Sequence, residues 1–236
     1  MFEVIPAIDV KGGALAHLTP DGLMRIDAFG GDPVAAAAAM IEAGATRLHV
    51  VDMDLAFEGE ARNLDVVSAI ASLRVHVQAA GGVRTADEVE SFLEAGADRV
   101  VLGSAGLADE AGATDLLKEE GERLLIGIEV GDDGEIRSRG RHPVELPLME
   151  TLGWLIAAGA PAFLVTAVAR VGSSIGPDVA SVRRVVRAGR PVLTAGGIRS
   201  IEDLRALRAA GAAGAVVGRA ALEGDLDLAT AIAELS

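Results

Sequence analysis

The chain has 236 residues, of which 50% are hydrophobic and 24% are charged, and it contains no Cys and no Tyr. The absence of Cys excludes a disulfide scaffold, a thiol nucleophile and a thiolate metal site. The formal net charge of -14 opposes attraction to nucleic acids and to anionic membranes, so neither is an expected partner. No signal peptide and no apolar run of about 18 residues is recognisable, so we expect a cytoplasmic protein.

Eight short apolar segments, rich in β-branched residues, predict eight strands. In chain order they are residues 2–9, 46–52, 75–80, 98–103, 123–129, 162–167, 191–196 and 214–218. Helical patterns lie between them: Asp32 and Pro33 suit the first two positions of one helix, and Thr85 and Ser200 suit the N-caps of two others. An Ala-Gly pair at the end of each of these patterns suits a helix C-terminus.

Strands that are apolar throughout and alternate with helices are typical of a parallel sheet covered by helices. Eight such units in a chain of this length predict a single α/β domain, a closed (β/α)8 TIM barrel. The most polar and least periodic stretch, residues 131–147, follows the fifth predicted strand. We therefore expect it to be a long βα loop on the catalytic face of the barrel.

One stretch of the chain is repeated. Residues 77–107 align without a gap with residues 192–222 at an offset of 115, and 12 of the 31 pairs are identical. Solenoid repeats are only about 20–50 residues long, so each copy of this repeat is expected to hold several strands and helices. The repeat predicts two half-barrels, approximately residues 1–120 and 121–236.

Glycines recur at matching places in the two halves. Gly81-Gly82 and Gly196-Gly197 each follow a predicted strand, and Gly103-Ser104 and Gly218-Arg219 follow the next strand in each half. Backbone N–H groups at such strand-to-helix turns can bind a phosphate. The alternative is that these glycines only permit tight turns. The occurrence of two copies, one at the seventh and eighth strands, favours a small-molecule substrate with two phosphates.

Carboxylates end two predicted strands on opposite sides of the barrel. Asp9 ends the first strand and Glu129 ends the fifth. A carboxylate at the end of an apolar strand is costly unless it is paired, solvated or used. Two carboxylates in different environments can supply a base and an acid for a proton transfer, and the alternative is that each binds amides of the following loop.

Other polar residues are less decisive. Asp52 and Asp54 suit either a loop-bracing role or a role on the catalytic face, and the sequence leaves this open. His17 and His76 have no partners at the spacing of metal ligands, so structural roles are favoured over a metal site, and we expect no bound metal.

Several segments together carry a family resemblance, and they span nearly the whole chain. They are IPAID, LHVVDMDLAFEGEARN, AGGVRTADEVESFLEAGADRVVLGSA, GSSIGPD and AGGIRSIEDLRAL. The chain resembles the phosphoribosylformimino-aminoimidazole carboxamide ribotide isomerases of histidine biosynthesis, including their actinobacterial bifunctional relatives. The resemblance implies a TIM barrel of two fused half-barrels. It also implies an Amadori rearrangement, in which an aminoaldose becomes an aminoketose without a cofactor. We expect the protein to be a monomer.

The resemblance also implies a set of site residues. Asp9 matches the base that removes the C2 proton, Thr166 matches a threonine of the site on the sixth strand, and Glu129 stands where the family's fifth strand ends in aspartate. One phosphate cradle is matched by Gly81, Gly82, Gly103 and Ser104, and the other by Gly172, Ser173, Gly196, Gly197, Gly218 and Arg219.

The chain departs from the family pattern at several of these places. Val171 occupies the position of the general acid, and Ala167 replaces a second aspartate. His17 stands in place of an arginine, residues 20–22 replace a Gln-Gly-Asp, and Pro143 stands where the bifunctional relatives have tryptophan. Valine cannot donate a proton, and a positioned acid contributes about 10²–10⁴ in rate.

Four hypotheses follow. The first is an isomerase of the histidine pathway with Asp9 as base and the acid function moved to Glu129 or to a solvent molecule near Ser173 and Ser174. The second is a weak or non-catalytic binder of phosphoribosyl compounds. The third is a phosphoribosylanthranilate isomerase, whose substrate has one phosphate. The fourth is the sister cyclase, which needs aspartates on both the first and the fifth strands and a glutaminase partner.

Overall fold

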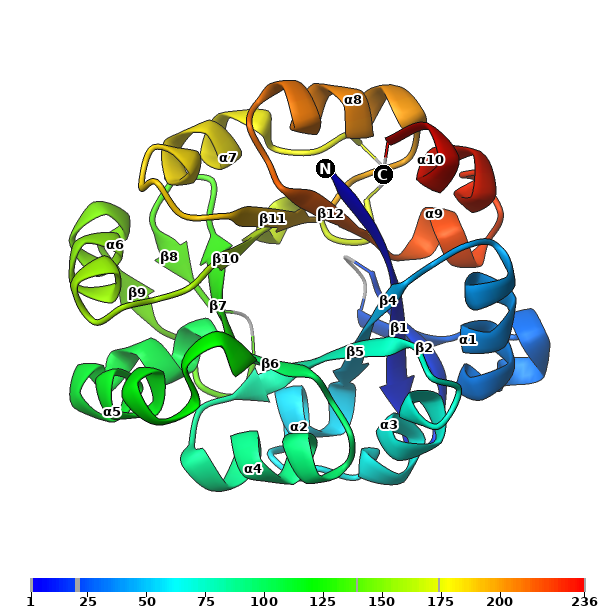
Figure 1. Cartoon of the computed structure of the whole chain (residues 1–236), viewed down its shortest axis with the longest axis horizontal. Helices are drawn as coiled ribbons and strands as arrows, with labels where there is room; N and C mark the ends of the chain where they lie inside the picture. Colours follow the sequence, from blue (N-terminus) through cyan, green and yellow to red (C-terminus); the bar gives the residue numbers. More distant parts are fainter. Residues whose placement is uncertain (1, 20–21, 139, 174, 236) are drawn as a thin grey trace.

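Eight parallel strands form a closed barrel at the centre of the computed structural model, which describes residues 2–19, 22–138, 140–173 and 175–235 (Figure 1). The barrel strands are β1 (Glu3–Lys11), β4 (Arg47–Asp52), β5 (His76–Val83), β6 (Arg99–Leu102), β7 (Leu124–Val130), β10 (Phe163–Ala167), β11 (Val192–Ala195) and β12 (Gly214–Val217). β12 pairs with β1, and pairing of β10 with β7 closes the ring. The eight predicted strands and the TIM-barrel fold are confirmed.

Helices surround the barrel on the outside (Figure 1). They are α1 (Pro33–Glu42), α2 (Met53–Glu58), α3 (Leu64–Ala71), α4 (Ala86–Glu94), α5 (Glu110–Glu120), α6 (Leu148–Ala157), α7 (Val179–Val186), α8 (Ile201–Ala209), α9 (Arg219–Leu222) and α10 (Leu228–Leu235). Short 3-10 helices occupy Ala28–Gly31, Ser104–Ala108, Gly121–Arg123 and Val168–Arg170. None of the described helices is long and apolar enough to cross a membrane.

The predicted helix starts are confirmed, because each capping side chain satisfies amides that the first helical turn leaves unpaired. Asp32 accepts hydrogen bonds from the amides of the next turn and is followed by proline at the first helical position of α1. Thr85 and Glu88 form a complete capping box on α4. Ser200 accepts from the amide of Asp203 on α8.

Two hairpins extend the barrel at the ends of strands. β2 (Ala14–Thr19) and β3 (Gly22–Arg25) follow β1, and the sequence patterns did not predict them because Thr19 is their only β-branched residue. β8 (Ile136–Arg137) and β9 (Glu145–Leu146) form within residues 131–147. This segment joins β7 to α6, which confirms that it is a βα loop.

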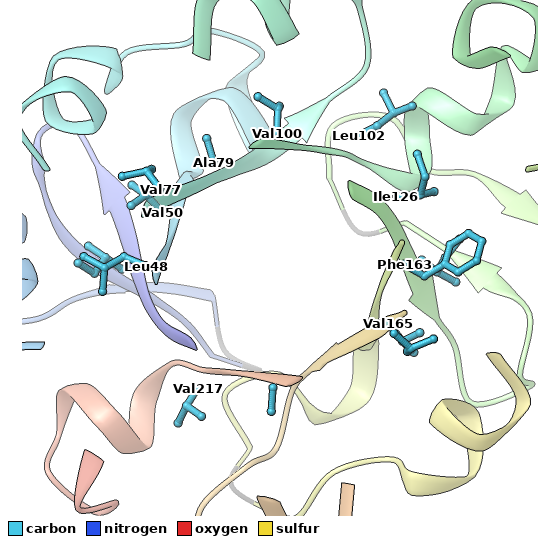
Figure 2. Packing of buried hydrophobic residues seen from close by; sticks show 14 of the residues in the cluster. Leu48, Val50, Val77, Ala79, Val100, Leu102, Ile126, Phe163, Val165 and Val217 are labelled. Atoms are coloured by element: carbon cyan, nitrogen blue, oxygen red, sulfur yellow. The ribbon is translucent and has the colours of Figure 1, made fainter. Parts of the chain in front are cut away.

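The hydrophobic core has two parts because successive side chains of a strand point to opposite faces. The larger part lies between the strands and the helices, and Figure 2 shows Leu48, Val50 and Phe163 directed away from the barrel axis. The smaller part fills the barrel interior and consists of Ile5, Ala7, Ala80, Val101, Leu125, Leu164, Leu193 and Val216. Burial on both faces explains why the strands are apolar throughout.

The pairing of the strands repeats at the offset of the sequence repeat. In the first half, the residues aligned across β4, β5 and β6 are His49, Gln78 and Arg99. In the second half, the residues aligned across β10, β11 and β12 are Leu164, Leu193 and Gly214. Each member of the second set lies 115 positions after its counterpart in the first. An origin by duplication stays a prediction.

Candidate active site

A cavity of about 250 Å³ opens at the carboxyl ends of the barrel strands, the place where TIM-barrel enzymes carry their active sites. Nearly all of the predicted site residues line it. They are Asp9, Glu129, Thr166, Gly81, Gly82, Gly103, Ser104, Gly172, Gly196, Gly197, Gly218 and Arg219. Ser173 lies beside this group, and its Oγ donates to the carbonyl oxygen of Arg170 at 2.7 Å. Ser174 lies outside the described residues.

The three predicted catalytic residues stand on opposite walls of the cavity. Asp9 is near the end of β1, whereas Glu129 and Thr166 are aligned with each other on the neighbouring strands β7 and β10. β1 and β7 lie across the barrel from one another (Figure 1). The Asp9 side chain is 20% exposed. A small molecule in the cavity therefore has a carboxylate on each side.

Val171 also lines the cavity, and Ala167 at the end of β10 is buried. These are the positions at which the resemblance led us to expect aspartates. Neither side chain can accept or donate a proton. Any acid in this cavity must therefore come from other residues of its wall.

His17 lies beside Asp9, a placement that the sequence did not indicate. It belongs to β2, is buried and lines the cavity. Its Nδ1 is 4.0 Å from Oδ2 of Asp9, and neither ring nitrogen has a hydrogen-bond partner among the described residues. Burial lowers the pKa of His17, an effect that Glu223 opposes and Arg219 reinforces.

His76 is paired with an aspartate, which is consistent with the structural role that the sequence favoured for it. Its Nδ1 is 2.8 Å from Oδ1 of Asp98, on the exposed surface. Within the described parts of the chain, no group of three or more His, Cys, Asp or Glu side chains is placed to hold a metal ion.

One glycine in each predicted cradle is required by close backbone packing. Gly81 has φ +142°, and a Cβ there would lie 2.4 Å from the carbonyl oxygen of Asp52. Gly197 has φ +78°, and a Cβ there would lie 2.3 Å from the carbonyl oxygen of Gly176. Because such contacts exclude any side chain, the tight turns alone account for these glycines. The glycines by themselves therefore do not indicate phosphate binding, and the other groups that line the cavity have to support it.

The polar side chains of the cradles hold neighbouring loops together. The buried hydroxyl of Ser104 donates to the carbonyl oxygen of Gly127 at 3.0 Å and accepts from the amide of Glu129 at 2.9 Å. The Arg219 guanidinium donates to the carbonyl oxygen of Gly172 at 2.7 Å and bonds Glu223 at 3.0 Å. The guanidinium of Arg219 thereby brings positive charge to the second cradle.

The loop between β7 and α6 places additional basic residues on the cavity wall. Arg141 and His142 line the cavity together with Arg84. The amide of Arg141 donates to the carbonyl oxygen of Ala56 and its Nη1 donates to the carbonyl oxygen of Glu58, each at 3.0 Å. The loop is thus fastened to α2. The sequence identified this segment as a loop on the catalytic face but did not single out its basic residues, although two Arg and one His within 139–142 were a usable signal.

Asp52 and Asp54 have the loop-bracing role, which settles the alternatives that the sequence left open. Both are buried, and both accept hydrogen bonds from the side-chain amide of Asn63, at 2.6 Å and 2.9 Å. Asp54 also accepts from the amide of Gly12 at 2.7 Å, and burial opposes the hydrogen bonds that lower its pKa. The network ties the turn after β1 to the loop after β4.

A line of polar side chains lies beneath the cavity, inside the barrel. His49 lines the cavity, and its Nδ1 is 2.7 Å from Nε2 of Gln78. Oε1 of Gln78 accepts from Nε of Arg99 at 2.7 Å, and Arg99 lies 3.9 Å from Glu3. Burial, reinforced by the positive charge of Arg99, lowers the pKa of His49 to about 4.

The chain is similar to known proteins over nearly its whole length. Residues 3–227 match the model of a family described as Histidine biosynthesis protein. The chain is 35% identical to a protein of Roseiflexus sp. over 98% of this chain and 99% of that protein. It is 37% and 38% identical to proteins of Geobacillus kaustophilus and Geobacillus thermodenitrificans, over 98% of this chain and 96% of each of them. All three bear the name 1-(5-phosphoribosyl)-5-((5-phosphoribosylamino)methylideneamino) imidazole-4-carboxamide isomerase.

The close packing at Gly197 yields a stability prediction. We expect Gly197→Ala to lower the free energy of unfolding by about 2 kcal/mol more than Gly189→Ala, because only the former creates a steric clash. The control is matched, since Gly189 also has a positive φ, +73°, and a Cβ there would have no other atom within 4 Å. Urea unfolding of the two variants measures the difference, and equal losses would contradict the packing account.

The buried imidazole of His49 yields a prediction about pH. Its folded pKa of about 4 lies below the ordinary value of about 6.5, so the unfolded chain binds the proton first. Its contribution to stability is present above about pH 6.5 and is lost as the pH falls toward 4. We expect a loss of about 2 kcal/mol in the free energy of unfolding between about pH 7 and pH 5.

Urea unfolding at the two pH values measures this loss. The His49→Gln variant cannot titrate, so its stability is expected to fall by about 2 kcal/mol less over the same interval. Buried His17 and the carboxyls of Asp54 and Asp98, whose pKa values are also lowered, titrate in both proteins and cancel in the comparison. The same pH dependence in both proteins would show that His49 is not the group responsible.

Proposed function

The chain belongs to the histidine biosynthesis protein family, and from this premise we propose that it is a cofactor-independent aldose-ketose isomerase of histidine biosynthesis. The proposed substrate is the phosphoribosyl aminoimidazole carboxamide bisphosphate on which the named relatives act. The observation that carries the proposal is one cavity in which Asp9 faces Glu129 and Thr166 between two sets of glycine turns. A ligand with a phosphate at each end would place its reacting sugar between the carboxylates.

The proposed reaction is a proton shift without net gain or loss of protons. An acid protonates the ring oxygen of the aminoaldose, the ring opens, and a Schiff base forms at C1. Asp9 removes the proton from C2, and the electron pair of that C–H bond forms the C1–C2 double bond of an enolamine. Asp9 then returns its proton to C1, and the C2 hydroxyl gives its proton to the conjugate base of the acid as the C2 ketone forms, so both groups are restored.

Glu129 is the proposed acid. It replaces the family's aspartate at the end of the fifth barrel strand and lies on the wall opposite Asp9. Its side chain is one methylene longer than aspartate, which extends its reach into the cavity. The family's usual position for the general acid is occupied by Val171, whose side chain has no proton to donate.

The two phosphates are assigned to the two glycine sets. Arg84 and Arg141 supply positive charge around the cavity in addition to Arg219, which offsets the net negative charge of the chain locally. A substrate with a single phosphate, such as phosphoribosylanthranilate, would leave one glycine set unused. This is why the bisphosphate is preferred as the substrate.

Val171 supports a second candidate, a protein that binds the bisphosphate without turning it over. Such a protein would keep the phosphate sites while lacking the acid. The two candidates differ in a single observable, which is turnover by the unaltered protein. A monomeric state and the duplication of a half-barrel remain predictions under either candidate.

The test is turnover of the aminoaldose bisphosphate, followed by absorbance, with the unaltered protein and three variants. We expect the unaltered protein to turn over. Asp9→Asn and Glu129→Gln should each lower kcat by about 10²–10⁴, the usual contribution of a positioned base or acid, with KM changed little. Val171→Asp serves as the comparison that restores the family's residue.

The outcomes separate the candidates. Turnover by Val171→Asp alone, with tight binding by the unaltered protein, would replace the isomerase proposal by the binding protein. Undiminished turnover by Asp9→Asn would remove Asp9 from its role as base. Undiminished turnover by Glu129→Gln would leave the isomerase intact but refute the relocated acid.

A further inference from the structure

The barrel interior contains a polar chain that the proposed acid and base do not use. His49, Gln78 and Arg99 are aligned on three neighbouring strands, and their side chains are joined by two hydrogen bonds of 2.7 Å each. Gln78 is completely buried and His49 is 7% exposed. Polar groups are costly in such surroundings unless they are hydrogen-bonded. The presence of this hydrogen-bonded row of side chains therefore needs a reason.

The chemistry of the three groups determines the direction of each hydrogen bond. A guanidinium can only donate, so the atom of Gln78 that bonds Arg99 must be its oxygen, Oε1. The other end of the amide, Nε2, can likewise only donate. It faces Nδ1 of His49, which must therefore be the acceptor. In a neutral imidazole, an accepting Nδ1 requires that the proton be on Nε2.

At neutral pH the imidazole of His49 is uncharged, whereas Arg99 at the other end of the hydrogen-bonded row is a cation. The low pKa of His49 means that the ring carries no positive charge at neutral pH. Burial also lowers the pKa of Arg99, to about 10, which still leaves it a cation near pH 7. Arg99 is balanced by Glu3 at 3.9 Å, and Glu3 is held in turn by Arg47 at 3.0 Å.

The second half of the barrel shows that packing does not require this polarity. At the offset of 115 residues, the positions of His49, Gln78 and Arg99 are occupied by Leu164, Leu193 and Gly214. Leu164 and Leu193 belong to the apolar filling of the barrel. The same layer is thus built from apolar residues in one half and from a hydrogen-bonded chain in the other. A structural need common to both halves therefore cannot explain the hydrogen-bonded row of His49, Gln78 and Arg99.

The cavity reaches down to the level of His49. His49 is aligned with Ala7, two residues before Asp9, and both Ala7 and His49 line the cavity. His49 therefore stands one layer deeper than Asp9 on the adjacent strand. Nδ1 of the ring is engaged by Gln78, so Nε2 is the ring nitrogen left to contact a ligand in the cavity.

We propose that Gln78, oriented by Arg99, holds His49 as the neutral Nε2–H tautomer, and that this N–H donates to the C2 oxygen of the substrate. His49 is then a further catalytic residue, and Gln78 is a positioning residue that acts through it. This assignment rests on the proposed isomerase function. The proton stays on Nε2 throughout, so the step changes no bonds and leaves the proton balance of the reaction as written above.

A hydrogen bond from Nε2–H of His49 to the C2 oxygen would lower the free energy of the transition state. Negative charge grows on the C2 oxygen as the enolamine becomes the ketone, and a fixed hydrogen-bond donor stabilises it more in the transition state than in the bound substrate. A neutral imidazole with a lowered pKa is known to act in this way in another barrel isomerase. Loss of the donor should therefore lower kcat more than it raises KM.

The first measurement is the tautomer of His49, read from the ring 15N resonances of histidine-labelled protein at neutral pH. The His49→Gln variant identifies the signals. We expect Nδ1 unprotonated and Nε2 protonated in the unaltered protein, and the proton on Nδ1 or a mixture of tautomers in Gln78→Met. Leu193→Met, at the equivalent position of the other half, is the matched control and should leave the His49 resonances unchanged.

The second measurement is turnover by the same proteins. Gln78→Met is expected to lower kcat about 10- to 100-fold, as loss of an orienting partner commonly does, with KM changed by a few-fold at most. Leu193→Met should retain activity. His49→Gln, whose amide can still donate, should retain more activity than His49→Leu, which is a readout that a purely structural role would not move.

Two results would overturn the proposal. One is a proton on Nδ1 of His49 in the unaltered protein, and the other is a Gln78→Met variant with unaltered kcat. The tautomer measurement requires no turnover, so it remains decisive if the isomerase function fails. In that case the bisphosphate aminoketose is added to the labelled protein, and an unchanged Nε2 resonance at saturation would refute the contact with the ligand.

Discussion

Closure of eight parallel strands into one barrel is the constraint on which the rest of the structure depends. Because all the strands run in the same direction, their carboxyl ends meet at one rim, and residues more than a hundred positions apart line one cavity. Asp9 and Glu129 face each other only for this reason. Side chains alternate between the helix-facing core and the interior, so one strand both anchors the fold and presents polar groups to the cavity.

The barrel interior is where stability and function compete. Its apolar part, which includes Leu125, Leu164 and Leu193, could fill the whole cross-section. The first half instead places His49 and Gln78 there, joined to each other and to Arg99 by hydrogen bonds, above the ion pair of Arg99 with Glu3. Hydrogen bonds of this kind offset the cost of placing polar side chains in a core, and they fix the orientation of those side chains.

The fold could be predicted from the sequence almost completely, because β-branched runs, helix caps and a constant repeat offset all indicate the same architecture. The glycines and the carboxylates at strand ends were located correctly for the same reason. Contacts made by the hairpins and loops outside the barrel strands were beyond the sequence patterns. His17 comes from a short hairpin that carries no strong periodicity, and its position 4.0 Å from Asp9 depends on how that hairpin folds back. The roles of Asp52 and Asp54 depend on Asn63, whose contacts no spacing rule indicates.

The central claim is that the cavity holds a ligand by two phosphates with Asp9 between them. Calorimetric titration of the unaltered protein with the bisphosphate aminoketose, and with two analogues that each lack one phosphate, tests it most directly. The account predicts that removal of either phosphate weakens binding by about tenfold or more, the loss of one or more charge-assisted hydrogen bonds. An analogue that binds as tightly as the bisphosphate would show that its missing end has no site and would contradict the account.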